Sequence, residues 1–477
     1  HMLYTVWITL FLYIFLHKQR SYFMGGKTHL EKGTIKKDAP DTPEIEFGRS
    51  QEDTYEPWKH RHLTHPLSTS GALAHLIKSS LGSGILAMPL AFKNGGLWTS
   101  LVGAIFVGFV YCHCVSILVY SSQVLCVRLR KPRLEFARIA EAAFQSGPVR
   151  LQGYTALAKV IVDVSLFAGY YSTCMVYVVF IASSLKQVLE HDFSVEMDIR
   201  LYILLTTVLV LPIGLIRNLK YLVPFSTFAI CALTISCVYV FYEIFQGLPP
   251  VFSRPAFKGF QTLPIFLTTV LFAFDGIGTA IPIENNMRNP KRFLSCPGVL
   301  NIAIIWLMTM YAGMGFFGYL RYGEATKGSI TLNISTSSIM GQAVKILVTL
   351  NVICSYALFL YVPVEILWHK LEPKFEKTRK SLYHYILRLV LVLGSVMVAV
   401  LVPDLETFVG LVGGISSTTL ILFFPPVIEL VTFWENKAYM GLLRWRLYKN
   451  LLILLMWLLI LVTGTRSSLV EIVRLYS

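Results

Sequence analysis

Charged side chains are scarce in this sequence. Only 14% of its 477 residues are Asp, Glu, Lys or Arg, while 55% are hydrophobic, and soluble domains have about 25% charged residues. A string of water-soluble domains is therefore excluded. Apolar stretches close to the ~20 residues that cross a bilayer recur along the chain. The composition thus indicates an integral membrane protein surrounded by lipid.

Motifs for nucleotide hydrolysis and for metal catalysis are missing as well. Residues 26–28 (Gly-Lys-Thr) resemble the end of a phosphate-binding loop, but Ser21 stands where that loop requires glycine. The sequence has no His-Glu-x-x-His zinc motif, and Cys112-x-Cys114 lacks a second cysteine pair. We therefore expect no metal, no cofactor and no enzymatic activity.

Hydrophobic runs predict an all-α fold with eleven transmembrane helices. The third run is too long for one perpendicular crossing, so we expect tilt or a protruding end. The predicted helices are 70–92, 97–121, 155–189, 199–216, 222–246, 263–285, 299–320, 342–368, 382–402, 405–431 and 449–465.

Basic residues gather in alternate loops. A net charge of +15 is also found in nucleic-acid-binding proteins, but here the loops after the even-numbered helices hold the basic residues, whereas loop 190–198 is acidic. Positive loops face the cytoplasm. We therefore expect no nucleic-acid partner, a cytoplasmic N-terminus and an extracellular or lumenal C-terminus. The sequon at Asn333 then faces outside, where we expect it to be glycosylated.

Two apolar spans are interrupted in the same way, by Gly-x-Gly followed by proline. The first break is Gly-Ser-Gly-Ile-Leu-Ala-Met-Pro at 82–89, and the second is Gly-Ile-Gly-Thr-Ala-Ile-Pro at 276–282. Unpaired backbone is tolerated at membrane depth only where it lines a cavity. Paired breaks at matching positions predict the central binding site of a transporter. The alternative is that the glycines only allow close helix packing.

The chemistry of the breaks predicts a zwitterionic ligand. The N–H groups freed at 82–84, with the positive end of a helix dipole, form an anion site. The carbonyl groups of 272–274, which we expect to lack partners, suit an ammonium group together with Asp275. Gly276 and Gly278 leave room for a small, uncharged amino acid, which phenyl rings cover. The predicted substrate-binding residues are Gly82, Ser83, Gly84, Phe272, Ala273, Phe274, Asp275, Gly276 and Gly278.

Ionisable residues inside the spans supply candidates for the driving force, because each costs ~2.5–3.5 kcal/mol at the bilayer centre. His75 lies two turns before the first break. Histidine is the side-chain type whose charge changes near neutral pH, so His75 is the first candidate for proton coupling. His113 and Glu284 are further candidates. For each of them, a structural role inside the bundle is the alternative. Sodium coupling stays open.

Other ionisable residues have simpler explanations. Lys159 and Asp163 are four residues apart on one predicted helix and are expected to neutralise each other. Glu429 lies near enough to a helix end to be solvated.

Residues 75–96, which begin His-Leu-Ile-Lys-Ser-Ser-Leu-Gly-Ser-Gly, resemble the first helix of the proton-coupled amino acid transporters, a solute-carrier branch of the amino acid/auxin permease family. Residues 274–287 (Phe-Asp-Gly-Ile-Gly-Thr-Ala-Ile-Pro-Ile-Glu-Asn-Asn-Met) are similar to the sixth helix of that family. The resemblance covers about 70–470 of the chain.

This resemblance implies the five-plus-five inverted repeat of the bacterial leucine transporter fold. The first repeat would be 70–246, the second 263–431, and an extra helix would lie at 449–470. It also implies that His75 and His113 match family histidines, the first of them linked to proton coupling. Asp275 departs from the family pattern, which usually has glutamate there, and the family's external cysteine pair is missing.

Residues 1–69 are predicted to form a cytoplasmic tail, mobile over 27–66. Residues 1–23 are either part of the protein or an addition before a true start at Met24.

The overall prediction is proton-coupled symport of small neutral amino acids by alternating access. The alternatives are a sodium-coupled or facilitative carrier and an amino acid sensor with little flux. We expect the plasma membrane or a lysosomal or endosomal membrane, and a nutrient-signalling partner stays unknown.

Overall fold

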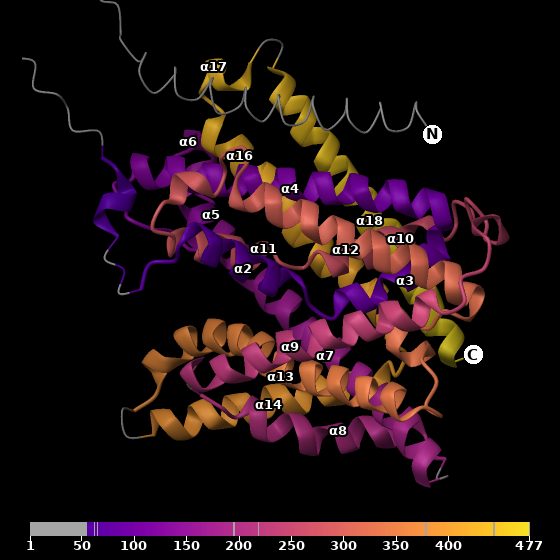
Figure 1. The fold of residues 1–477 in the computed structure, drawn as a ribbon. Coiled ribbons are helices and arrows are strands. Elements are labelled where there is room, and N and C mark those ends of the chain that lie inside the picture. Colours follow the sequence, from indigo (N-terminus) through magenta and orange to yellow (C-terminus); the bar gives the residue numbers. More distant parts are fainter. Residues whose placement is uncertain are drawn as a thin grey trace, which may run out of the picture.

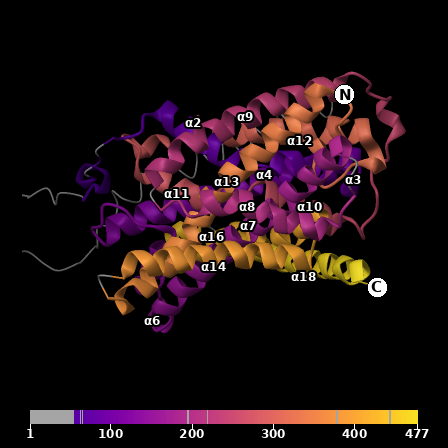
Figure 2. The same ribbon diagram turned by 90° about the horizontal axis from the view of Figure 1, so that it is seen from below.

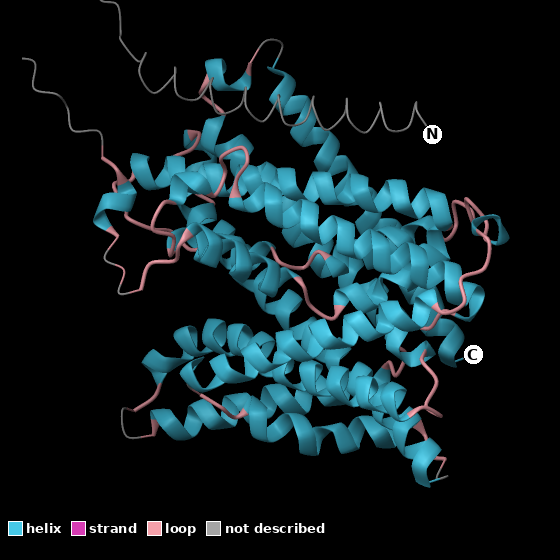
Figure 3. Cartoon of the chain, in the orientation of Figure 1, coloured by secondary structure: helices cyan, strands magenta, loops and turns pink. Residues whose placement is uncertain are grey.

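The computed structural model describes residues 55–61, 63, 65–193, 196–217, 219–376, 379–441 and 444–476. The predictions for residues 1–23 and for most of the tail lie outside these residues. In the described part, regular structure is helical apart from one isolated parallel bridge between Leu67 and Met287 (Figure 3). The all-α prediction is confirmed.

Each predicted helix has a counterpart, and three of these counterparts are divided into two α-helical segments. The counterparts are α2 (Thr69–Ser80) with α3 (Gly84–Gly95), α4 (Leu97–Arg128), α7 (Thr155–Phe193), α8 (Ile199–Gly214), α9 (Leu219–Phe245), α10 (Leu263–Ala273) with α11 (Ile277–Asn285), α12 (Val299–Tyr322), α13 (Ile339–Leu371), α14 (Lys380–Leu401), α15 (Leu405–Val412) with α16 (Phe424–Phe433), and α18 (Trp445–Tyr476). Between α15 and α16 the chain forms wider π-helical turns.

Most of these helices are long enough to cross a bilayer. In the described residues, nine helices have the required length and apolar composition, or ten if the bent pair α2–α3 counts as one span. Helix α8 is shorter, because its 16 residues rise only about 24 Å at 1.5 Å per residue. The hydrocarbon core is about 30 Å thick. The multi-spanning prediction is confirmed, whereas helix length alone does not give the number eleven.

Helix α7 is the long third helix of the prediction. Its 39 residues would extend about 58 Å, well beyond the hydrocarbon core. It packs against α5 (Phe136–Gln145), a short helix that the sequence analysis did not anticipate. Arg138 and Glu141 on α5 form a surface ion pair at 2.7 Å. The ten residues of α5 are too few for a bilayer-length apolar run, so the hydrophobic runs did not reveal this helix.

Helices α3 and α10 are mostly buried among other helices, whereas α2 lies nearer the edge of the bundle (Figures 1 and 2). Helix α3 packs against α10 and α12, and α2 packs against α11 and α12. Helix α13 packs against α7 and α9, while α18 lies along α10 and α15. Every residue of α3 from Gly84 to Phe92 is buried. The architecture therefore surrounds both breaks with other helices.

Candidate functional site

The first predicted break is present between α2 and α3, whose axes differ by 56°. The Leu81 N–H still donates to the Ile77 carbonyl at 2.7 Å, but the Gly82 N–H turns back to Ser80 O at 3.0 Å. The first backbone hydrogen bond of the new helix is donated by the N–H of residue 85. The N–H groups of residues 83 and 84 thus lie at the start of α3, ahead of its helical hydrogen bonds.

The second break covers residues 274–276, between α10 and α11. The Asp275 N–H donates to Phe272 O at 3.2 Å, and the Gly276 N–H donates to Phe274 O at 2.8 Å. The expectation that these carbonyl groups lack partners is therefore wrong, because tight local turns satisfy them. A carbonyl oxygen has two lone pairs, so each retains capacity for a ligand.

A tyrosine of α12 connects the two breaks. The Tyr311 hydroxyl oxygen lies 2.5 Å from Ser80 O and 3.0 Å from Ala273 O. These carbonyl groups belong to the last residues of α2 and α10, where a continuous helix would have supplied N–H partners. The buried Tyr311 ring also packs edge-on against Phe274, at 5.1 Å between ring centroids. Sequence reasoning missed Tyr311, because the meeting of two helix ends on α12 is a tertiary feature.

The two breaks touch each other. A Cβ atom on Gly84 would lie 2.6 Å from the Cα atom of Ala273, well inside the ~3.5–4.0 Å of favourable carbon contacts. Glycine at 84 therefore lets the start of α3 meet the end of α10 backbone to backbone. This contact puts amide donors and carbonyl acceptors side by side, as recognition of a zwitterion requires.

The two glycines of the second break, Gly276 and Gly278, have a packing role. A Cβ atom on Gly276 would lie 2.5 Å from Ser80 Oγ, and one on Gly278 would lie 2.6 Å from the Tyr170 hydroxyl oxygen. Ser80 and Tyr170 thus fill the space that we expected a ligand to use. At these positions, the alternative of close helix packing explains the glycines better.

A cavity of about 20 Å³ lies between the breaks. It has room for about one water molecule and is far smaller than an amino acid. Its walls are Ser79, Ser80, Gly82, Ser83, Gly84, Thr173, Tyr177, Phe272, Ala273, Asp275 and Phe359. The predicted residues that do not line it are Phe274, Gly276 and Gly278. Phe274 instead packs between Tyr111 and Tyr311.

Helices α7 and α13 supply walls that the sequence analysis did not name. Tyr177 and Phe359 pack edge to face with ring centroids 5.3 Å apart. Thr173 Oγ1 lies 3.5 Å from Asp275 Oδ2. Single aromatic or hydroxyl residues are common in apolar helices, so nothing in the sequence distinguished these three.

None of the three candidates for proton coupling lines the cavity. His75 is exposed on α2. His113 is half-buried on α4, within electrostatic range of Glu429 and Lys449. In the described residues, no group of three or more His, Cys, Asp or Glu side chains is placed to hold a metal ion.

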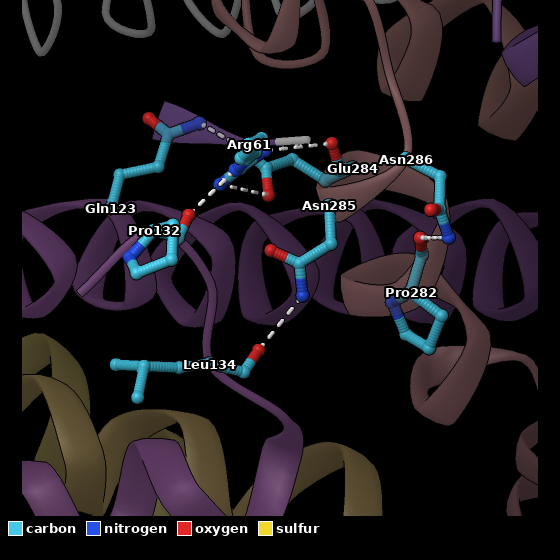
Figure 4. A network of polar contacts seen from close by, with 8 residues as sticks. All are labelled: Arg61, Gln123, Pro132, Leu134, Pro282, Glu284, Asn285 and Asn286. Atoms are coloured by element: carbon cyan, nitrogen blue, oxygen red, sulfur yellow. Dashed lines mark hydrogen bonds and ion pairs between the residues drawn. The ribbon is translucent and has the colours of Figure 1, made fainter. Parts of the chain in front are cut away.

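Glu284 is buried at the end of α11, in a network of polar contacts (Figure 4). Its Oε1 accepts a hydrogen bond from Gln123 Nε2 at 2.9 Å, and its Oε2 lies 3.4 Å from Arg61 Nη2. The next residue, Asn285, donates through Nδ2 to Leu134 O at 2.8 Å. Arg61 lies in the tail that was predicted to be mobile, and for this residue the prediction is wrong.

Two further charged residues depart from expectation. Asp163 pairs with Lys370 of α13 at 3.9 Å, across helices, instead of with Lys159 on its own helix. Glu429 is 1% exposed and accepts hydrogen bonds from Tyr439, Lys449 and Asn450 at 2.7–2.8 Å. The prediction of a solvated Glu429 is wrong, because α17 (Lys437–Met440) and α18 cover it.

The fold and the site together define a class of protein. Membrane-length helices enclose two broken helices whose ends meet at a small polar cavity. Helices broken at membrane depth in this manner are the binding elements of solute transporters. The molecule is a multi-pass membrane transporter.

The chain belongs to the transmembrane amino acid transporter family, whose model, described as transmembrane amino acid transporter protein, matches residues 65–470. The proton-coupled amino acid transporter-like protein pathetic of Drosophila melanogaster is 39% identical over 423 residues, covering 89% of each chain. The probable amino acid transporter skat-1 of Caenorhabditis elegans is 24% identical, covering 87% of this chain and 94% of the relative. The family prediction is confirmed.

Solved structures give more distant similarities. The inward-facing conformation of Mhp1 has a TM-score of 0.49 and 12% identity, covering 86% of this chain and 92% of that chain. The substrate-bound outward-open state of a Na⁺-coupled sialic acid symporter has a TM-score of 0.48 and 12% identity, covering 96% of this chain and 97% of that chain.

Proposed function

We propose that this chain is a secondary active transporter that moves a small neutral amino acid together with a proton by alternating access. One observation carries the proposal: the start of α3 and the end of α10 meet at a single cavity. The Drosophila relative is named a proton-coupled amino acid transporter-like protein, which supports the proton as the coupling ion.

The two ends of the amino acid would bind to different breaks. The α-carboxylate would accept hydrogen bonds from the N–H groups of Ser83 and Gly84, where the helix dipole of α3 favours negative charge. The ammonium group would donate to the carbonyl oxygens of Phe272 and Ala273 and would be attracted by Asp275. All five residues line the cavity.

The size of the cavity supports a closed state and a small substrate. With room for about one water molecule, the site has to widen before it admits an amino acid. Tyr177 and Phe359 form aromatic walls of the cavity, and rotation of these side chains would make room for the substrate. A long or charged side chain would demand a larger displacement of these walls.

Topology follows from the same proposal. We propose eleven spans, with inverted repeats at 70–246 and 263–431 and an added helix at 449–470. Helix α8 would cross where the bilayer thins or its neighbours shield it. The N-terminus would be cytoplasmic and the C-terminus extracellular or lumenal, in the plasma membrane or a lysosomal or endosomal membrane.

His75 is the residue that we propose for proton exchange. It is exposed on α2, five residues before the break at Ser80, and a histidine changes charge near neutral pH. His113 and Glu284 remain secondary candidates. Glu284 is already paired with Arg61 at 3.4 Å.

Uptake into proteoliposomes tests the function. The purified chain should accumulate labelled alanine, glycine or proline when the outside is acidified, and a protonophore should abolish accumulation. Lysine and glutamate should be poor substrates. Replacing sodium with choline at fixed pH should leave uptake unchanged. Sodium-dependent uptake without acid stimulation would assign the coupling to sodium, and saturable binding without uptake would indicate a sensor.

A further inference from the structure

A segment before α2 lies against the end of α11. We call it the N-terminal strap and define it by Glu56, Trp58, Arg61 and Leu67. The Leu67 N–H donates to the carbonyl of residue 286 at 2.8 Å, and the N–H of residue 288 donates to Leu67 O at 2.9 Å. The strap is thus joined backbone to backbone to the chain that leaves α11.

Arg61 is the centre of the strap (Figure 4). Its Nε donates to Pro132 O at 2.7 Å and its Nη1 donates to Glu284 O at 3.2 Å, while Nη2 pairs with the Glu284 carboxylate at 3.4 Å. The planar fork of a guanidinium suits several fixed acceptors. The side chains of Arg61 and Glu284 are only 3% and 1% exposed, so this pair differs from a solvated surface ion pair.

The far end of the strap has a second anchor. Lys291 Nζ lies 4.4 Å from the ring centroid of Trp58 and 3.7 Å from Glu56 Oε1. Lys291 belongs to the loop that follows α11. Both ends of the strap therefore hold the same region of the second broken helix.

The strap bridges elements that separate if the site opens on this side. Arg61 precedes the start of α2 by eight residues, and α2 leads to the first break. Glu284 lies at the other end of α11 from Gly276, about 12 Å along the helix axis. Helix α2 and α11 pack against each other. A path from the cavity to this end of the bundle requires that contact to loosen.

We propose that the N-terminal strap is a latch for the predicted cytoplasmic side, which Arg61 keeps closed by docking on Glu284. Undocking of Arg61 frees α2 from α11 and the loop at Pro132, and only then does the site open to this side. The latch rests on the alternating access of the proposed function, but it can be tested without any substrate.

The labelling rate of the Cys126 thiol can report whether the latch is open. The thiol is buried on α4, within electrostatic range of Arg61 and Glu284. We expect a reagent to reach this thiol faster when the strap lifts. Cys174, buried on α7 and lining neither the strap nor the cavity, reports global unfolding instead.

The experiment measures the labelling rate of Cys126 in the full chain in detergent with a charged maleimide, read by mass spectrometry of the Cys126 peptide. We expect Arg61→Ala to label at least about tenfold faster than wild type, since removing one partner of a buried ion pair is strongly unfavourable. Arg61→Lys, which keeps the charge but loses the fork, should label at an intermediate rate. Arg138→Ala, which removes a surface arginine from an ion pair on α5, should match wild type. Cys174 should stay protected in all variants.

Two outcomes would overturn the latch. One is wild-type labelling of Cys126 in both Arg61 variants. The other is parallel labelling of Cys126 and Cys174, which would mean that Arg61 only supports the fold. If Arg61→Ala does not fold, the comparison of Arg61→Lys with wild type decides by the same criterion. Absence of amino acid uptake would contradict the proposed function and leave these labelling rates unaffected.

Discussion

The hydroxyl oxygen of Tyr177 lies 4.0 Å from the position that a Cβ atom would take on Gly82. An alanine at 82 therefore fits without a clash, yet its methyl group faces the cavity. We predict that Gly82→Ala folds like wild type, with a free energy of unfolding within about 0.5 kcal/mol. Affinity for the amino acid should fall about tenfold, the effect of a misplaced methyl in a confined site. Thermal unfolding and ligand binding measured on one preparation check both parts.

Gly84→Ala is the matched contrast, because its added methyl would meet the Ala273 backbone at 2.6 Å. Forcing a methyl into this contact should cost about 1–3 kcal/mol of stability and should separate the two breaks. We expect a lower unfolding temperature and lost uptake. Equal stability of the Gly82→Ala and Gly84→Ala proteins would show that the breaks are not in contact in the membrane.

Tyr311→Phe removes the hydroxyl that links Ser80 O to Ala273 O and keeps the ring. Leaving buried carbonyl groups less satisfied costs about 1–3 kcal/mol, and the freed helix ends should bind substrate less well. We expect a higher KM for uptake along with reduced stability.

Tyr319→Phe is the control for Tyr311, on the same helix and equally buried. Its hydroxyl donates to Glu324 Oε1 at 3.1 Å, away from both breaks. It should leave KM unchanged. A KM for Tyr311→Phe equal to that of Tyr319→Phe would remove Tyr311 from the site.

The sequence was sufficient to place both breaks. Glycine is unfavourable in a helix interior, so the closely spaced Gly82 and Gly84 and the pair at Gly276 and Gly278 marked the breaks without tertiary information. The helix ends α2, α3, α10 and α11 then followed to within a few residues.

The cavity walls could not be read from the sequence in the same way. Tyr177 and Phe359 reach the site through the packing of α7 and α13, and helix periodicity does not say which neighbour a face meets. Gly276 and Gly278 have the same local signature as Gly84, but Ser80 and Tyr170 occupy the space beside them. The polar composition around Arg61 is typical of a solvated tail, and the buried acceptors at Glu284 and Pro132 that hold this side chain are tertiary contacts.

Glu429→Leu should strongly destabilise the protein. Glu429 is buried and pairs with Lys449 at 2.7 Å, so the substitution leaves a largely buried ammonium without its carboxylate. Breaking a buried ion pair costs about 3–5 kcal/mol, to be measured by thermal or denaturant unfolding. Glu471→Gln breaks an exposed pair with Arg474 and should change stability by less than about 1 kcal/mol. Similar losses for both variants would contradict the buried arrangement.

Asn333 tests the predicted topology. Its Nδ2 donates to Ala325 O at 2.7 Å and its Oδ1 accepts from the Lys327 N–H at 2.9 Å. A glycan on Nδ2 leaves one N–H for the loop. We expect a glycosidase-sensitive mobility shift that Ser335→Ala abolishes while keeping the Asn333 side chain. Absence of the shift in cells that glycosylate a control protein would count against a lumenal loop.

His75→Gln should abolish the pH dependence of uptake. Glutamine keeps a polar side chain on the exposed face of α2 but has no proton to exchange near neutrality. We expect the acid stimulation of uptake to disappear, with measurable uptake remaining at a single pH. His191→Gln is the control, because His191 is also exposed and lies 2.9 Å from Asp192, far along the chain from the breaks. An unchanged pH profile in His75→Gln would move the coupling elsewhere, and a profile flattened equally by both variants would mean that neither histidine acts specifically.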